Sequence, residues 1–371
     1  MENTAIKSSI PIEDIPMDSS RKVNRKPIII GLIAGAVLVG VIGYFLIPKT
    51  GSVQENKLIQ AMDKVLPTPT PGPFVDMTIP YLRSKNYDGK LGERSQVNTN
   101  GSYASYLTSY TSDGLKINGV ITIPSGEKPE KGWPAIIFIH GYIPPTIYQT
   151  LTNYTAYVDY LARNGFVVFK IDLRGHADSE GEASGAYYSG DYIVDALNAY
   201  TALQKDGQVN PDGIGIWGHS MAGNVTLRTL AAKPTIPAAV IWAGAVYTYQ
   251  DMQEFGIQDN SYRPPTDNTN RQRKRDLLFK TYGQFDPKSP FWKTVVATNY
   301  LDEIQGAIQL DHAVDDDVVS VEYSRGLDRL LDRTKVEHEL HEYPSGGHNI
   351  NGASFNVAMK NTVEFFKKHL Q

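Results

Sequence analysis

The segment IWGHSMAGNV, residues 216–225, determines how this chain can fold. Its first half continues an apolar, strand-like run, whereas the residues after Ser220 suit a helix. A serine at such a strand–helix junction lies in a sharp, strained turn, and small residues must flank it because strand and helix nearly collide there. Gly218 stands two residues before Ser220, while Ala222, in place of the more usual glycine, and then Gly223 follow it. The segment therefore predicts an exposed serine hydroxyl beside the N-terminus of a helix.

Strand-like and helix-like patterns alternate on both sides of this junction, from about residue 104 to the C-terminus. Alternation of this kind predicts a mostly parallel sheet with helices on both faces. Two period-two runs, 103–112 and 115–124, are separated by Asp113-Gly114 and predict a hairpin at an antiparallel edge. The expected later strands are 134–141, 165–175, 213–220, 238–244, 307–313 and 335–344, and the expected helices are 153–164, 191–205, 221–232, about 320–333 and 352–369.

The stretch 245–305 interrupts this alternation. It is polar and aromatic, and rich in Arg, Asp and Pro. An insertion between two strands of a parallel sheet is well placed to cover the carboxyl edge, where such folds bind ligands. We therefore expect a cap over the sheet at about residues 245–305.

The composition excludes several classes of function. The 371 residues contain no cysteine, so thiol catalysis, disulfides and cysteine-based zinc sites are ruled out. The net charge is −4 and the charges are interspersed, so a nucleic-acid partner is not expected. The acidic run at 315–317 lacks the spacing of a calcium loop, and we expect neither a metal ion nor an organic cofactor.

Residues 28–47, IIIGLIAGAVLVGVIGYFLI, carry no charge and are long enough to cross a bilayer as a helix. Four basic residues precede them closely: Arg21, Lys22, Arg25 and Lys26. By the positive-inside rule, residues 1–27 form a cytoplasmic tail and the rest of the chain is exported. A cleaved signal peptide is the alternative, but the run is too long and no small-x-small cleavage site ends it. Residues 48–103 are expected to form a proline-rich tether and lead-in.

A serine hydroxyl becomes a useful nucleophile only when a base takes its proton. In the strand–serine–helix arrangement, an acid and then a histidine follow the serine in the chain. His348 fits this order because it lies in the Gly-rich loop YPSGGHNING, directly after the last expected strand. The acid should lie in the loop after strand 307–313. Three aspartates stand there: Asp315, Asp316 and Asp317.

Two backbone N–H groups are candidates for stabilising a negatively charged oxygen at this site. One belongs to Met221, which directly follows the serine, and the other to Tyr142, in the loop after the strand PAIIFIHG. Donors placed on either side of a nucleophile in this way form an oxyanion hole. The side chains of His140 and His176 are expected to brace the loops in which they lie.

Four further motifs recur in a known order: SDGLKINGVITIP at 112–124, IFIHGY at 137–142, DLRGHADSEG at 172–181 and GHSMAG at 218–223. With these, residues 104–370 resemble the α/β-hydrolase superfamily, and within it the catalytic domain of prolyl oligopeptidase-type serine peptidases and related esterases. HAVDDDVVS, at 312–320, is similar to the family pattern H-G-x-x-D-x-x-V-P, although Ala313 and Ser320 depart from it. In that register Asp316 is the acid, which leaves its neighbours as solvated residues capping the next helix.

The resemblance implies a catalytic domain at 104–371 in which Ser220, Asp316 and His348 form a triad. The implied function is that of a membrane-anchored, extracytoplasmic serine hydrolase that cleaves a peptide or small ester bond through an acyl-enzyme. A carboxylesterase or acyltransferase on the same triad is the alternative. Only about thirty residues separate the tether from the first expected strand, so the β-propeller of large oligopeptidases is not expected here, and release of dipeptides is less favoured. The sequence leaves the oligomeric state open.

Overall fold

The computed structural model describes residues 72–183, 186–257 and 270–371. The expected cytoplasmic tail, the membrane helix at 28–47 and the tether as far as residue 71 lie outside these ranges. Within them, no helix combines the length and the apolar character that crossing a bilayer requires.

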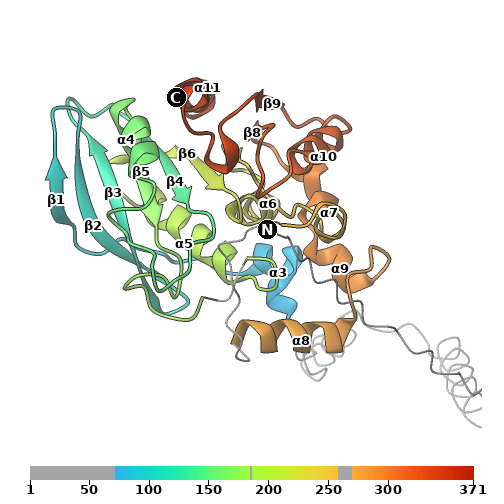
Figure 1. Cartoon of the computed structure of the whole chain (residues 1–371). Coiled ribbons are helices and arrows are strands. Elements are labelled where there is room, and N and C mark those ends of the chain that lie inside the picture. The colour runs from blue at the N-terminus through green and yellow to red at the C-terminus, as the bar shows by residue number, and fades with distance from the viewer. Residues whose placement is uncertain (1–71, 184–185, 258–269) are drawn as a thin grey trace, which may run out of the picture. The chain divides into compact units, whose positions relative to one another are not determined.

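The described residues form a nine-stranded sheet in the order β1-β2-β3-β5-β4-β6-β7-β8-β9 (Figure 1). Its first three strands and the β3–β5 pair are antiparallel, and all the remaining pairs are parallel. The prediction of a mostly parallel sheet with an antiparallel edge is therefore confirmed. The strands are β1 (Ser95–Thr99), β2 (Tyr103–Ser112), β3 (Leu115–Pro124), β4 (Trp133–Ile139), β5 (Val167–Ile171), β6 (Val209–His219), β7 (Ala238–Trp242), β8 (Ala307–Ala313) and β9 (His338–Tyr343).

The edge hairpin forms as its turn residues dictate. Ser112 pairs with Leu115, which leaves a two-residue turn of Asp113 and Gly114. Both turn residues have positive φ, 52° and 78°, as the tightest hairpin turns require. The bounds of β2 and β3 match those expected because this signal is local.

Helices cover both faces of the sheet and form two separate apolar layers. α4 (Thr155–Arg163) and α11 (Ala353–Leu370) pack on one face, and α5 (Asp191–Gln204), α6 (Ala222–Ala232) and α10 (Glu322–Leu331) pack on the other. In β4, Phe138 points to the first layer and Ile137 and Ile139 to the second. Both faces of a central parallel strand are buried, which is why β4 reads as an unbroken apolar run.

The expected insertion contains α7 (Tyr249–Phe255), α8 (Asn270–Tyr282), α9 (Pro290–Val295) and a 3₁₀ segment, η2 (Ala297–Glu303). It has an aromatic core of its own. Trp292 is fully buried, and its ring meets those of Tyr249 at 4.9 Å and Phe285 at 5.9 Å between centroids. The aromatic residues of this stretch therefore serve packing in part, and we call residues 245–305 the cap.

The packed part of the chain begins upstream of residue 104, which corrects the expected boundary. A 3₁₀ turn, η1 (Val75–Met77), and α3 (Ile79–Ser84) bury Met77, Ile79 and Leu82 completely, and α3 lies beside α8 in Figure 1. Tyr282 at the end of α8 donates a hydrogen bond to the carbonyl of Pro73 at 2.7 Å. These segments, of three and six residues, are too short to show a hydrophobic period, so the sequence pattern did not reveal them.

One buried arginine joins this upstream segment to the centre of the fold. Arg228, on α6, is 1% exposed and donates to the carbonyls of Met77, Ala186 and Ser189 at 2.6, 3.2 and 2.8 Å. Two segments that are remote in sequence, one at Met77 and one at residues 186–189, therefore meet on a single guanidinium group of α6.

Candidate active site

Ser220 lies in the strained turn that the sequence predicts. It follows the end of β6 with φ of 56°, in the left-handed region that side chains other than glycine seldom adopt. A Cβ atom on Gly218 would lie 2.3 Å from Thr226 Oγ1 and 2.9 Å from the carbonyl oxygen of Ala222, so only glycine fits there. The Ser220 N–H donates to the carbonyl of Trp242 on β7 at 2.9 Å. Strand, turn and helix thus hold the serine backbone in place.

The structure brings together the three side chains expected to form a triad. His348 Nε2 lies 2.8 Å from Ser220 Oγ, and His348 Nδ1 lies 2.8 Å from Asp316 Oδ2. The histidine comes from the 3₁₀ turn η3 (Gly347–Asn349) after β9, and the aspartate from the loop after β8. The histidine side chain is 16% exposed and the aspartate side chain is fully buried. The hydroxyl, imidazole and carboxylate therefore form one hydrogen-bonded line whose catalytic role remains a prediction.

The hydrogen bonds of Asp316 keep it charged although it is buried. Its Oδ1 accepts the backbone N–H groups of Val318 and Val319, both at 2.9 Å. Its Oδ2 accepts from the rings of His348 and His312, at 2.8 and 3.2 Å. Burial on its own would raise the pKa of Asp316, but the hydrogen bonds from His312 and His348 outweigh it and hold this pKa well below the usual range.

This arrangement also determines which nitrogen of His348 carries the proton. An ionised carboxylate can only accept, so the hydrogen between Asp316 and His348 must lie on Nδ1. Nε2 then has a free lone pair, which faces the Ser220 hydroxyl and accepts its hydrogen. The ring is therefore ready to act as a base toward the serine.

The neighbouring aspartates have other roles. Asp315 is exposed, as expected, but it accepts hydrogen bonds from the backbone N–H groups of Gly346 and Gly347 at 3.2 and 2.8 Å instead of capping the next helix. It therefore holds the loop that carries His348, a role that sequence reasoning missed because Asp315 and that loop are 31 residues apart. Asp317 is exposed.

The two predicted oxyanion donors belong to backbone segments that meet at the serine turn. Met221 immediately precedes α6, where the first N–H groups of a helix have no carbonyl partner within the helix. Tyr142 follows Gly141, which packs so closely on the turn that a Cβ atom there would lie 3.1 Å from Ser220 Cβ. The positions suit an oxyanion hole, and the donation itself remains a prediction.

His140 and His176 lie in buried positions near this loop, in keeping with the bracing role expected for them. The ring of His140 stacks on Tyr148 with 4.3 Å between centroids, and His176 packs against its edge at 5.0 Å. Burial lowers the pKa of His140 to about 3 and that of His176 to about 4, so both are neutral near pH 7.

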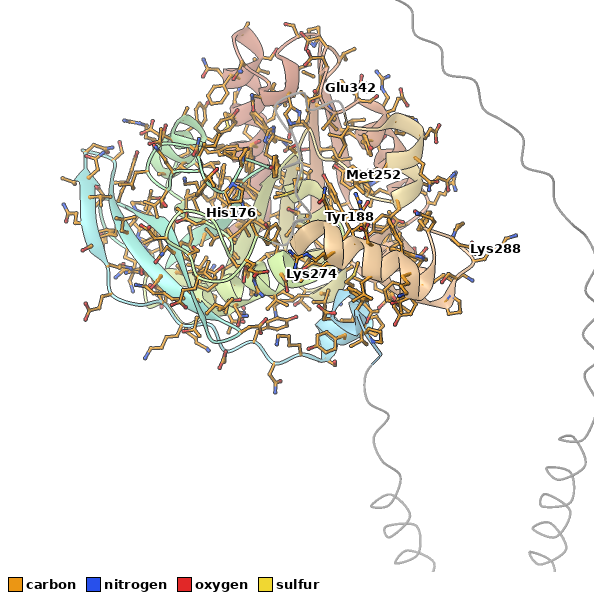
Figure 2. All side chains as sticks on the ribbon, turned by 60° about the horizontal axis from the view of Figure 1, so that its bottom comes forward. His176, Tyr188, Met252, Lys274, Lys288 and Glu342 are labelled. Atoms are coloured by element: carbon orange, nitrogen blue, oxygen red, sulfur yellow. The ribbon has the colours of Figure 1, made fainter. Side chains whose placement is uncertain are left out.

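A cavity of about 470 Å³ opens in the cap, within the size range of small-molecule sites. Four aromatic rings and a thioether line it, with polar side chains that include the ion-paired Arg275 and Asp276. The rings and thioether belong to Tyr188, Tyr249, Phe279, Phe285 and Met252. Figure 2 shows Tyr188 and Met252 close to α8, and the Tyr188 hydroxyl lies 3.7 Å from the Met252 sulfur.

The cavity is joined to the serine turn by a short stretch of backbone. Ala245 N–H donates to the carbonyl of Ser220 at 3.1 Å, and α7, which contributes to the cavity, begins four residues later at Tyr249. Four residues of extended chain span at most about 14 Å. The backbone that joins Ala245, at the serine turn, to Tyr249, at the cavity wall, is therefore no longer than about 14 Å.

Comparison with protein families and with curated proteins points to hydrolases. A family model described as serine aminopeptidase, S33, matches residues 133–263. An uncharacterized peptidase of Bacillus subtilis, YtmA, is 24% identical over 257 residues, which cover 66% of this chain and 85% of the relative.

Solved structures resemble the chain in fold. The dipeptidyl peptidase 4 of Porphyromonas gingivalis matches with a TM-score of 0.56 and 21% identity, over 72% of this chain but only 36% of the peptidase. The chain thus spans about a third of that enzyme's length. An acetyl xylan esterase from Paenibacillus sp. R4 has the same TM-score at 15% identity, and the match covers 84% of this chain and 99% of the esterase.

Proposed function

Because this chain is an α/β-hydrolase, whose relatives and structural neighbours are serine peptidases and esterases, we propose that Ser220, His348 and Asp316 cleave a peptide or ester bond through an acyl-enzyme. The resemblance expected from the sequence is confirmed at the level of this superfamily. The observation that carries the proposal is the unbroken line from Ser220 Oγ through the His348 ring to Asp316, with both contacts at 2.8 Å.

In the first half of the reaction, the Ser220 oxygen attacks the substrate carbonyl carbon while His348 Nε2 takes the hydroxyl proton. The carbonyl oxygen becomes negative and is held by the N–H groups of Tyr142 and Met221, each contributing roughly 3 kcal/mol to lowering the barrier. Asp316 stabilises the imidazolium that forms. His348 then gives its proton to the leaving amine or alcohol, and an acyl-enzyme remains.

In the second half, water attacks the acyl-enzyme with His348 again acting as the base. The acid is released and the proton returns to Ser220. An acyltransferase would use an alcohol or amine in place of this water on the same groups.

A serine peptidase is our first proposal because the matching family model and YtmA are both described as peptidases. An esterase is the second, and one observation favours it. The match covers 84% of this chain and 99% of an acetyl xylan esterase, so an esterase of this fold need be no larger than this chain. The substrate of either enzyme would place an apolar or aromatic group in the cap cavity.

The cellular setting is proposed from the sequence alone. Residues 28–47 would anchor the chain in the membrane, with residues 1–27 in the cytoplasm and the catalytic domain outside. If so, alkaline carbonate would leave the full chain in the membrane fraction, and deletion of residues 28–47 would release it. Release of the undeleted chain by carbonate would contradict the anchor.

Labelling with a fluorophosphonate tests the nucleophile. The full chain in detergent micelles should take up one label, and Ser220→Ala should take up none. Ser125→Ala, on an exposed turn, is the matched control and should label like the natural chain. Full labelling of Ser220→Ala would reject the assignment.

A matched substrate pair separates the two activities. An ester and an anilide that share one acyl group and one chromophore differ only in the bond to be broken. A peptidase cleaves both, whereas an esterase cleaves the ester and leaves the anilide intact. Activity on neither, in protein that takes up the label, would exclude hydrolysis of this substrate class.

A further inference from the structure

Three hydrogen bonds connect the two loops that serve Ser220, through side chains that the reaction itself does not use. The N–H of Gly141 donates to the hydroxyl oxygen of Tyr154 at 2.9 Å. That hydroxyl lies 2.7 Å from His219 Nδ1, and His219 Nε2 lies 2.8 Å from the carbonyl oxygen of His348. The chain of contacts thus runs from the loop of the predicted oxyanion donors to the backbone of the catalytic histidine.

In this series of three hydrogen bonds, each hydrogen atom has only one possible position. The carbonyl of His348 can only accept, so His219 must carry its hydrogen on Nε2. His219 is 2% exposed, and burial, the largest effect, lowers its pKa to about 3, so the ring is neutral. Its Nδ1 therefore accepts the hydrogen of Tyr154, whose oxygen is left to accept from Gly141.

The backbone of Tyr154 supports a positioning role. Tyr154 precedes α4 with φ of 62° and ψ of 18°, in the left-handed region, which is costly for an aromatic residue. Its ring packs against Phe138 of β4 at 5.5 Å between centroids. A residue held in this conformation directs its hydroxyl to a fixed point, and that point lies between Gly141 and His219.

The two ends of this hydrogen-bond series constrain the predicted oxyanion donor and the histidine base. At one end the Gly141 N–H is taken up by Tyr154, and the next N–H along the backbone is the predicted oxyanion donor of Tyr142. At the other end His219 holds the carbonyl of His348 and packs its ring on the His348 ring, with 4.7 Å between centroids. The donor and the base come from loops about 200 residues apart in sequence, so their relative position depends on contacts of this kind.

We propose that Tyr154 and His219 are positioning residues that tie the oxyanion loop to the backbone of His348 and keep the two in register during acyl transfer. The inference rests on the proposed function, because it needs Ser220 as the nucleophile. Neither residue touches the substrate or gives up a proton.

The first test is Tyr154→Phe in the full chain, which deletes one oxygen atom. We expect kcat to fall about tenfold while KM stays within about twofold, since the loss affects the aligned transition state more than binding. The rate of fluorophosphonate attack on Ser220 should fall by a similar factor, because that reaction also forms a tetrahedral adduct. Tyr103→Phe is the matched control: its hydroxyl binds Asp159, on the same helix, and the variant should behave like the natural chain.

Two replacements of His219 each keep one of its two hydrogen bonds and remove the other. Glutamine places an amide near the Nε2 position and can still donate to His348, whereas asparagine places one near Nδ1 and can still accept from Tyr154. If the link between the loops is what matters, both variants lose about tenfold in kcat. Full activity in either variant would overturn the proposal, because one of the two hydrogen bonds of His219 would then be enough for catalysis.

A double-mutant cycle supplies the decisive measurement. His219→Gln already breaks the contact with Tyr154, so adding Tyr154→Phe should cost less than about twofold more. For comparison, Phe279→Trp alters the cap cavity, whose lining includes no residue of either loop. Its effect should multiply with that of His219→Gln. Multiplying effects for Tyr154 and His219 would overturn the coupling.

The outcome is separable from that of the proposed function. Turnover and labelling that survive in Ser220→Ala would reject the nucleophile whatever Tyr154 does. If Ser220 is required and Tyr154→Phe works within about twofold of the natural chain, only the positioning inference fails. Thermal melts and the fraction of protein that takes up label identify a variant that has not folded, and the His219 pair then decides.

Discussion

Replacing Asp316 by asparagine makes the sharpest test of the site, because the hydrogen bonds around this residue leave the new side chain a single orientation. The N–H groups of Val318 and Val319 both point at Oδ1, so the amide oxygen must take that place. The amide NH₂ then occupies the position of Oδ2 and faces His348 Nδ1 at about the present distance of 2.8 Å.

An NH₂ group donates, so His348 can keep its place only by moving its hydrogen from Nδ1 to Nε2. In that tautomer Nε2 has no lone pair for the Ser220 proton. In serine triads a change of this kind lowers kcat by about 10³- to 10⁴-fold, equivalent to roughly 4 to 5.5 kcal/mol of barrier. The fold should lose less than about 2 kcal/mol, because His312 Nε2 can still donate to the carbonyl of Val319, at 2.9 Å.

The assay is hydrolysis of a chromogenic ester under saturating substrate, together with urea unfolding of each variant. Asp317→Asn is the matched control, since it makes the same chemical change on an exposed neighbour and should alter kcat by less than about twofold. A kcat within tenfold of the natural chain in folded Asp316→Asn would refute the reasoning. An equal loss of kcat in Asp316→Asn and Asp317→Asn would also refute it, because the loss would then follow from the changed net charge of the loop.

Three further outcomes are expected. Gly218→Ala should lower the free energy of unfolding by about 1–3 kcal/mol and abolish labelling, because the added methyl group would lie 2.3 Å from the Thr226 oxygen. Adding Thr226→Ala removes that oxygen and should restore part of the labelling. Labelling that recovers in full, or not at all, would contradict this geometry. Burial raises the pKa of Asp311 from 3.8 to about 7, so this group stabilises the fold below about pH 4 and loses that contribution, at most about 4 kcal/mol, as pH rises through 7. The free energy of unfolding, measured by urea titration from pH 4 to 8, should therefore change less with pH in Asp311→Asn than in the natural chain. An equal pH dependence in the two proteins would refute this role of Asp311. Phe279→Trp should lower kcat/KM about tenfold for arylacyl esters and leave acetyl esters unchanged, whereas an equal effect on both would remove the cavity from substrate binding.

The features that the sequence predicted well are those with local causes. The hairpin of β2 and β3 follows from two turn residues that adopt positive φ, and the serine turn follows from Gly218 and its neighbours. His348 could be singled out because only one histidine loop follows the last strand. Spacing alone did not distinguish Asp316 from its two neighbours, and the family resemblance was needed to choose it.

The features that were missed depend on contacts between distant segments. Asp315 holds a loop 31 residues away, and Tyr154 meets a histidine 65 residues away. Neither contact leaves a hydrophobic period or a turn motif, so the residue types could not reveal them. α3 was missed for the same reason, because its burial depends on α6 and the cap and not on a pattern of its own.

Arg228 has a consequence for any protein engineered from this chain. An ion withdrawn from water needs other dipoles in place of its hydration shell, and here three carbonyls, one of them that of Met77, take that place. Trimming past Met77 would leave a buried cation partly unsolvated in the helix that starts beside Ser220. A shortened chain should therefore retain Pro73 and Met77, whose carbonyls accept from Tyr282 and Arg228.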